Sequence, residues 1–150
     1  MFTKCPKCGY EEITPNMYHQ RNARYKGMKL GKSNTSMQQY GCALMCFSYV
    51  TDKDPLDVNQ LFIEKGVYSV DMIDFAKACE VLGLKNYEKS KDINRMPTQE
   101  EVIKEVKLGK GQHFVVRINK DGKRTIFDTW TGANQSINYY PFVSYRIFNK

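Results

Sequence analysis

The stretch Gln39-Tyr40-Gly41-Cys42-Ala43-Leu44-Met45-Cys46 decides how the rest of the chain can be arranged. A glycine precedes a cysteine there, and an apolar run of helical character follows from Ala43 to Val50. In a helix that begins at Cys42, the sulfur lies over the first turn, where unpaired N–H groups and the helix dipole favour an anion. The thiolate is the reactive form of cysteine, so this position suits a nucleophile, whereas most free cysteines are buried and inert. The stretch alone leaves both interpretations open.

The length of 150 residues fits one domain with a hydrophobic core. Hydrophobic residues make up 41% of the chain, with 10 tyrosines and 8 phenylalanines, which is typical of globular proteins. No apolar stretch approaches the length of a membrane span, and the first residues lack the apolar core of a secretory signal. We therefore expect no membrane insertion, and a protein that works in a cytoplasm or is released by lysis or within a particle such as a phage.

The formal net charge of +7 favours an anionic partner, such as nucleic acid, an anionic wall polymer or an acidic peptide. Plain solubility explains the charge equally well. Lysine and arginine are spread along the chain, and one local bias stands out. Five basic residues occur there with no acid between them: Arg21, Arg24, Lys26, Lys29 and Lys32.

Residues 1–16 form a separate unit in this interpretation. The chain has five cysteines, and this odd number fits a reducing compartment better than a disulfide framework. Cys5-Pro6-Lys7-Cys8-Gly9 is a knuckle of the kind that presents two thiolates, here Cys5 and Cys8, to one zinc or iron. No second Cys-x-x-Cys follows, so the pair predicts either a zinc site completed by a second chain or a vestigial or redox pair.

A loop-rich arm and four helices are predicted next. Residues 17–41 are dense in Gly, Ser and Asn, so this arm must be held by tertiary contacts. The first helix is predicted at 42–51, and the second is capped by Asp54 and stops at Gly66. The third is capped by Ser69 and ends at Gly83. The fourth begins with the capping box Thr98-Gln99-Glu100-Glu101 and ends at Gly109. Cys79 falls in the apolar stripe of the third helix and is expected in the core. Residues 85–96 show no strong pattern.

The remainder predicts an antiparallel sheet, so that helices followed by strands give an α+β fold. β-branched and aromatic residues mark the strands, which we expect at 112–118, 123–128, 136–140 and 145–148, with a turn at 119–122.

His113 and Asp128 open and close the first two of these strands. A symmetric turn that places Ile118 opposite Lys123 also places His113 opposite Asp128, where the carboxylate can hold the imidazole. The same register pairs Arg117 with Arg124, which is unfavourable, and a bulge at the turn would shift it. A strand histidine with an ordinary structural role is the alternative. With Cys42, the chain nevertheless contains the nucleophile, base and orienting acid that thiol catalysis needs.

Several motifs also carry a family resemblance over residues 17–148. The segments Gln20-Arg21-Asn22-Ala23-Arg24-Tyr25, Leu30-Gly31 and Tyr40-Gly41-Cys42-Ala43-Leu44 resemble the opening of the peptidase C39-like domains, in the papain-like cysteine peptidase superfamily. Asp54-Pro55 to Asn59 is similar to the second helix of the family. Gln112-His113-Phe114-Val115-Val116 and Ile126-Phe127-Asp128-Thr129-Trp130-Thr131-Gly132 are similar to its histidine and aspartate strands. The resemblance implies a papain-like fold over residues 17–150, with N-terminal helices packed on a C-terminal antiparallel sheet.

The roles that the resemblance implies are specific. Cys42 is the nucleophile, His113 the general base and acid, and Asp128 the residue that orients His113. Gln20 donates its amide to the oxyanion, with the Cys42 N–H as second donor. Trp130 is similar to the tryptophan that shields the polar partner of the histidine, although ordinary core packing also explains it. Cys46 is expected to pack rather than react.

The expected function is hydrolysis of amide bonds through an acyl-enzyme, without a catalytic cofactor. The substrate is a peptide, such as a leader after a double glycine, or a peptidoglycan cross-link. Leader-processing relatives are usually fused to a transporter, which this chain lacks, and an acyl transferase with the same residues stays open. The alternative is a non-catalytic binding module on a degenerate peptidase scaffold, with the cysteine knuckle and basic surface on nucleic acid or another anionic partner.

Overall fold

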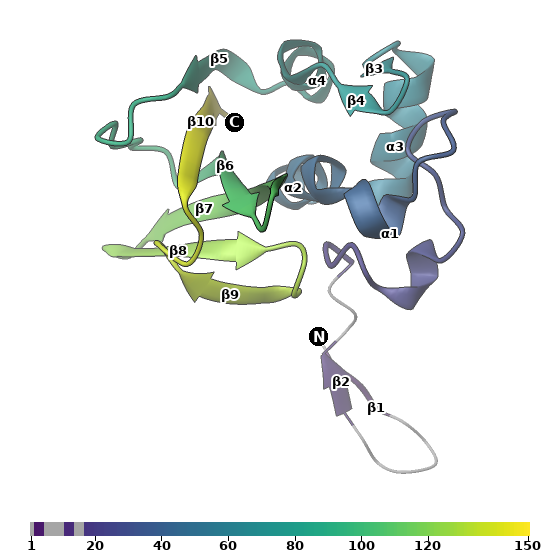
Figure 1. Cartoon of the computed structure of the whole chain (residues 1–150), viewed down its shortest axis with the longest axis horizontal. Coiled ribbons are helices and arrows are strands. Elements are labelled where there is room, and N and C mark those ends of the chain that lie inside the picture. Colours follow the sequence, from purple (N-terminus) through teal and green to yellow (C-terminus); the bar gives the residue numbers. More distant parts are fainter. Residues whose placement is uncertain (1, 5–10, 14–16) are drawn as a thin grey trace.

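The computed structural model describes residues 2–4, 11–13 and 17–150 (Figure 1). Its described part is an α+β structure with four α-helices and a six-stranded antiparallel sheet of order β5-β10-β6-β7-β8-β9. Two small hairpins accompany the sheet, β1 (Phe2–Lys4) with β2 (Glu11–Ile13) and β3 (Tyr68–Ser69) with β4 (Met72–Ile73). The Cys5 and Cys8 pair lies outside the described residues.

Helix α2 (Cys42–Thr51) begins and ends as the sequence predicts. The short helix α1 (Met37–Tyr40) directly precedes it, and the left-handed residue Asp52 ends it. Leu44, Met45 and Phe47 of α2 are fully buried, and the helix packs against β6 and β7. This helix, with Cys42 as its first residue, is therefore held against two inner strands of the sheet.

Helix α3 (Pro55–Glu64) also confirms its start signal, because the Asp54 carboxylate accepts the backbone N–H of Leu56. The third predicted helix, in contrast, starts too early. Residues 68–73 form the β3–β4 hairpin, whose turn contains Val70 at a positive φ of 60°. Helix α4 (Phe75–Leu82) then begins behind the cap Asp74 rather than Ser69 and ends at Gly83 as predicted.

The fourth predicted helix is wrong. Its apolar residues lie in β6 (Glu101–Leu108), which pairs with β10 (Phe142–Asn149) on one side and β7 (Gly111–Lys120) on the other. The β-branched residues Val102, Ile103 and Val106 are all fully buried there. A central position between two strands outweighs the local capping signal. Residues 85–90, which showed no pattern, form the edge strand β5 (Lys85–Ser90).

The register of β7 and β8 (Lys123–Asp128) differs from the predicted one. The hairpin closes with a two-residue turn, Asp121-Gly122, in which both residues have positive φ values of 53° and 73°. Lys120 therefore pairs with Lys123, and Val116 with Phe127. His113 and Asp128 are not direct partners, and the unfavourable pair of Arg117 and Arg124 does not form, since Arg117 faces Ile126.

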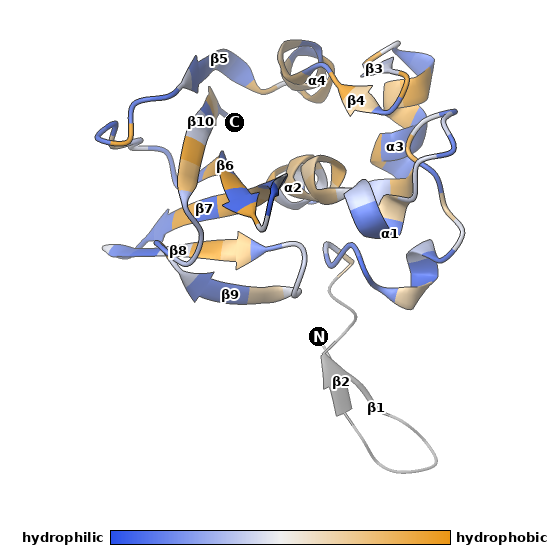
Figure 2. Ribbon diagram, in the orientation of Figure 1, coloured by the Kyte–Doolittle hydropathy of each residue, from blue (hydrophilic) through white to orange (hydrophobic). Residues whose placement is uncertain are grey.

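The strand expected at 136–140 lies earlier, as β9 (Ala133–Ser136), and the strand expected at 145–148 is the longer β10. Figure 2 shows polar residues along the edge strands β5 and β9 and apolar residues in β6 and β10 between them. This distribution leaves the apolar strands covered and the two sheet edges polar.

The predicted arm is held by tertiary contacts. Tyr25, Leu30 and Met37 bury their side chains in the main core cluster. Asn59 of α3 accepts the Gly31 N–H at 3.0 Å and donates to the Lys29 carbonyl at 3.1 Å. None of the described helices has the length and apolar character needed to cross a membrane.

Candidate active site

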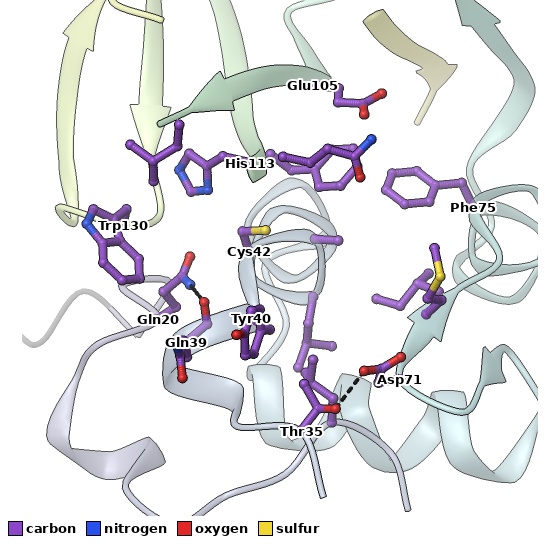
Figure 3. A pocket seen from close by; sticks show the side chains of 18 of the residues that line it. Gln20, Thr35, Gln39, Tyr40, Cys42, Asp71, Phe75, Glu105, His113 and Trp130 are labelled. Atoms are coloured by element: carbon purple, nitrogen blue, oxygen red, sulfur yellow. Dashed lines mark hydrogen bonds between the residues drawn. The ribbon is translucent and has the colours of Figure 1, made fainter. Parts of the chain in front are cut away.

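A cavity of about 890 Å³ opens at the N-terminal end of α2 (Figure 3). Residues of the arm, the β3–β4 hairpin and strands β5, β6 and β7 line it. In Figure 3, Trp130 and Gln20 lie on one side, Phe75 lies on the other, and Cys42 lies between them. Cys42 therefore lies inside the cleft, which extends from it toward Trp130 and Gln20 on one side and toward Phe75 on the other.

Gly41 brings α1 and α2 close together. A Cβ atom at this position would lie 2.3 Å from the carbonyl oxygen of Met37, which accepts the Gly41 N–H at 2.9 Å. Cys42 follows as the first residue of α2 and is partly exposed. No described side chain caps this helix, so its first N–H groups are available to another acceptor.

His113 and Asp128 meet despite the shifted register. Because Phe127 pairs with Val116, alternation puts Asp128 on the face of β7 that carries Val115 and His113. The Nε2 atom of His113 lies 2.8 Å from Oδ1 of Asp128, and both residues are almost completely buried. The contact is therefore diagonal: the register places Asp128, at the end of β8, opposite Val115, but Asp128 bonds to His113, two residues before Val115 in β7.

The Asp128 carboxylate has two further donors. Oδ1 accepts the Trp130 backbone N–H at 3.0 Å, and Oδ2 accepts the Tyr140 hydroxyl at 2.5 Å. Burial raises the pKa of Asp128, but the hydrogen bonds from His113, Tyr140 and Trp130 outweigh it and hold this pKa below its usual value. The carboxylate is thus ionised and fixed from three sides.

The protonated form of His113 is favoured. Burial of the ring lowers the pKa of His113, but the hydrogen bond to Asp128 and the interaction with Cys42 outweigh it and raise the pKa to about 9. Nε2 is occupied by Asp128, so Nδ1 is the nitrogen that remains for Cys42. A charged imidazolium beside a thiol is the electrostatic condition that stabilises a thiolate.

Gln20 lies beside this group and is 1% exposed. Its Oε1 accepts the Thr129 hydroxyl at 2.9 Å, and its backbone N–H donates to the Thr129 carbonyl, also at 2.9 Å. Nε2 donates to the carbonyls of Gln38 and Gln39, both at 3.3 Å. These contacts fix the amide with its nitrogen toward the segment that leads into Cys42.

Trp130 lines the same cleft, and its ring lies under the guanidinium of Arg21, 4.5 Å from the ring centroid. The aromatic ring that packs against the His113 imidazole is not that of Trp130 but that of Tyr140, which lies edge-on with 5.6 Å between the ring centroids. Arg24, from the same basic run as Arg21, is paired with Asp54 at 2.8 Å, so part of this charge serves the fold.

The remaining thiols belong to the core. Cys46 and Cys79 are buried in the main apolar cluster, and burial raises the pKa of both. His19 binds the Trp130 carbonyl through Nε2 at 3.1 Å. Within the described ranges, no group of three or more His, Cys, Asp or Glu side chains is arranged to hold a metal ion.

Sequence reasoning placed Cys42, His113, Asp128 and Gln20 in one site, and all four side chains lie around this cleft or its immediate support. It missed Thr129 and Tyr140, which hold Gln20 and Asp128. Thr129 follows Asp128 directly, so its position next to the acid that the sequence predicts to orient His113 was the available signal. No family model, curated protein or solved structure matches the chain.

Proposed function

We propose that the protein is a cysteine hydrolase of amide bonds, with Cys42 as nucleophile, His113 as base and acid, and Asp128 as the orienting carboxylate. One observation carries the proposal. A buried imidazole, held at Nε2 by an ionised carboxylate and with its pKa raised to about 9, shares a cleft with a partly exposed cysteine at the start of a helix.

Acylation follows from this arrangement. The Cys42 sulfur attacks the carbonyl carbon, a C–S bond forms, and the carbonyl electron pair moves to oxygen. The Cys42 N–H donates to this oxyanion, and the Nε2 amide of Gln20 donates as well when one of its N–H groups leaves the Gln38 or Gln39 carbonyl. When the C–N bond breaks, Nδ1 of His113 gives its proton to the leaving amine.

Deacylation reverses these roles. His113, now neutral, takes a proton from water as the water oxygen bonds to the thioester carbon. The C–S bond then breaks, the acid leaves, and His113 and Cys42 return to the charged pair. Asp128 stays ionised throughout and stabilises the imidazolium each time it forms.

The proposal extends to the family and the fold. The helix that starts at Cys42 packs against an antiparallel sheet that carries His113 and Asp128, an arrangement in keeping with a C39-like domain of the papain-like superfamily. On this proposal the substrate is a peptide or a peptidoglycan cross-link.

Selective thiol labelling tests the proposal. We expect iodoacetamide at mildly acidic pH to modify Cys42 faster than any other cysteine, as measured by peptide mass spectrometry. Cys46 and Cys79 provide buried internal references. His113→Gln removes the imidazolium, so we expect it to slow Cys42 labelling by tenfold or more.

The reverse result is equally clear. If Cys42 reacts no faster than Cys5 and Cys8, or if His113→Gln leaves its rate unchanged, the hydrolase proposal fails. Cys42→Ser serves as the matched control, because it removes the sulfur with little change of volume.

A further inference from the structure

Glu105 is a buried acid in the same cleft that the proposed mechanism does not use. It lies in β6 opposite Phe114, the residue that follows His113 in β7, and it is 3% exposed. Because side chains alternate along a strand, Glu105 shares the face of β7 that carries Phe114, whereas His113 points to the other face. It also lines the cavity (Figure 3).

Only one oxygen of this carboxylate is engaged. Oε1 accepts the Ser144 hydroxyl at 2.7 Å and the Arg146 guanidinium at 3.1 Å. No residue in the described part of the chain donates to Oε2. Arg117 Nε is the one side-chain atom of this part that is both sealed from solvent and unpartnered. Oε2 thus keeps some exposure to solvent, and it belongs to a residue that lines the cavity.

The surroundings of Glu105 are aromatic and positively charged. The Arg146 guanidinium lies 4.5 Å from the ring centroid of Phe75 and 5.6 Å from that of Phe114, and both rings line the cavity. Lys89 of β5 lies opposite Arg146 of β10 in the strand register, and it also lines the cavity. The charge of Glu105 is thus already balanced by Arg146, with a second cation nearby.

We propose that this end of the cleft is a specificity subsite for a peptide side chain that is aromatic and ends in a neutral hydrogen-bond donor, with tyrosine as the best fit. The rings of Phe75 and Phe114 pack against the side chain, and Oε2 of Glu105 accepts its hydroxyl. A lysine side chain fits worse, because its charge meets Arg146 and Lys89. The inference rests on the proposed function.

Matched covalent probes test the subsite. The full chain is treated with dipeptidyl vinyl sulfones that differ at one position, tyrosine, O-methyltyrosine, phenylalanine or lysine, placed first or second from the electrophile. The rate of Cys42 labelling is followed by intact mass. A hydrogen bond to a carboxylate predicts that the tyrosine probe reacts roughly tenfold to a hundredfold faster than the phenylalanine probe at one of the two positions.

Glu105→Gln is the informative variant, and its fold is checked by thermal unfolding. Ser144 and Arg146 hold the amide oxygen, so an amide N–H faces the subsite, and we expect the tyrosine to phenylalanine ratio to fall below about threefold. Gln112→Ala, which changes an exposed neighbour lining the same cavity, is expected to keep the ratio.

The comparison of probes on the unmodified chain decides the matter even if Glu105→Gln does not fold. Equal rates for tyrosine and phenylalanine at both positions, equal rates for tyrosine and O-methyltyrosine, or a preference for lysine would overturn the subsite. If iodoacetamide labels Cys42 selectively but none of the probes does, the subsite proposal is also overturned, while the hydrolase proposal stands. If Cys42 does not react with iodoacetamide, both the subsite proposal and the hydrolase proposal fail.

Discussion

Thr129 donates its hydroxyl to Oε1 of Gln20 over 2.9 Å, and both residues are almost completely buried. Thr129 directly follows Asp128, which holds His113 at 2.8 Å. Two consecutive residues at the end of β8 therefore position the proposed base and the proposed oxyanion donor. Removing the Thr129 hydroxyl is therefore expected to release Gln20 but leave His113 held, and removing the Asp128 carboxylate is expected to do the reverse.

Thr129→Val removes the hydroxyl with little change of shape, and this variant separates the two roles. We expect acylation of Cys42 by p-nitrophenyl acetate, which needs an oxyanion donor, to slow by about tenfold. Alkylation by iodoacetamide forms no oxyanion, so its rate is expected to stay within about twofold. Thr129→Ser keeps the hydroxyl and is expected to restore acylation. Equal loss in both reactions would point to a general structural defect.

The raised pKa of His113 predicts a pH-dependent stability. The folded pKa of about 9 lies above the unfolded value of 6.5, so this group stabilises the fold fully below pH 6.5 and loses its contribution as the pH rises through 9. The contribution is roughly 3 kcal/mol. Urea unfolding at pH 6 and pH 10 is expected to show a larger drop for the natural chain than for His113→Gln. The same titration predicts that amide hydrolysis falls off above about pH 9.

Tyr140→Phe removes one of the three donors to Asp128. The folded pKa of Asp128 lies below its unfolded value, so its stabilisation is present at neutral pH and is lost as the pH falls through the folded value. We expect the variant to lose about 1–3 kcal/mol at pH 7 and less than that at pH 3, by urea unfolding. Tyr139→Phe, at the exposed neighbour, is the control, and equal losses in the two variants would contradict this account.

Gly41→Ala tests the close contact of α1 and α2. A Cβ atom 2.3 Å from the Met37 carbonyl forces the start of α2 to move, so we expect a loss of about 2 kcal/mol or more and slower labelling of Cys42. Gly111→Ala is matched to it, because its Cβ would meet nothing closer than 3.7 Å and its φ is negative or extended. A neutral Gly41→Ala variant would show that the junction can relax.

The knuckle is tested by metal content. If the pair forms a zinc site, protein purified without added metal is expected to contain zinc and Cys5→Ser to abolish it, as measured by elemental analysis, whereas a vestigial or redox pair predicts no zinc in either protein. Equal zinc content in the two proteins would assign the pair to another role. Cys79→Ser, in the core, is the control for unspecific binding to thiols.

The elements that depend on short-range signals could be predicted. The start of α2 at Cys42 and of α3 behind Asp54 depend on residues within one helical turn. Strand β6 was missed because the spacing of Val102, Ile103 and Val106 fits a helix as well as a buried strand. Only pairing with β7 and β10 decides between them, and β10 lies about forty residues further along the chain.

The site shows the same division. Cys42, His113 and Asp128 could be named because each stands at the end of a locally recognisable element. Their diagonal contact could not be derived, since the two-residue turn at Asp121-Gly122 sets the register. Strand pairing brings Glu105 to the cleft, and a turn brings Tyr140 to Asp128, both from parts of the chain far from the cysteine, and no local pattern marks either residue.

The tight turn between β7 and β8 has a consequence for how this chain can change over time. One residue inserted into it would slip the pairing by a single step and turn the Asp128 carboxylate to the opposite side of the sheet from His113. The same slip would carry Phe127 out of the main core cluster, so a longer loop would cost core packing as well as the contact between Asp128 and His113. Among the connections of the sheet, this one is expected to keep its length in any descendant that retains a working thiol.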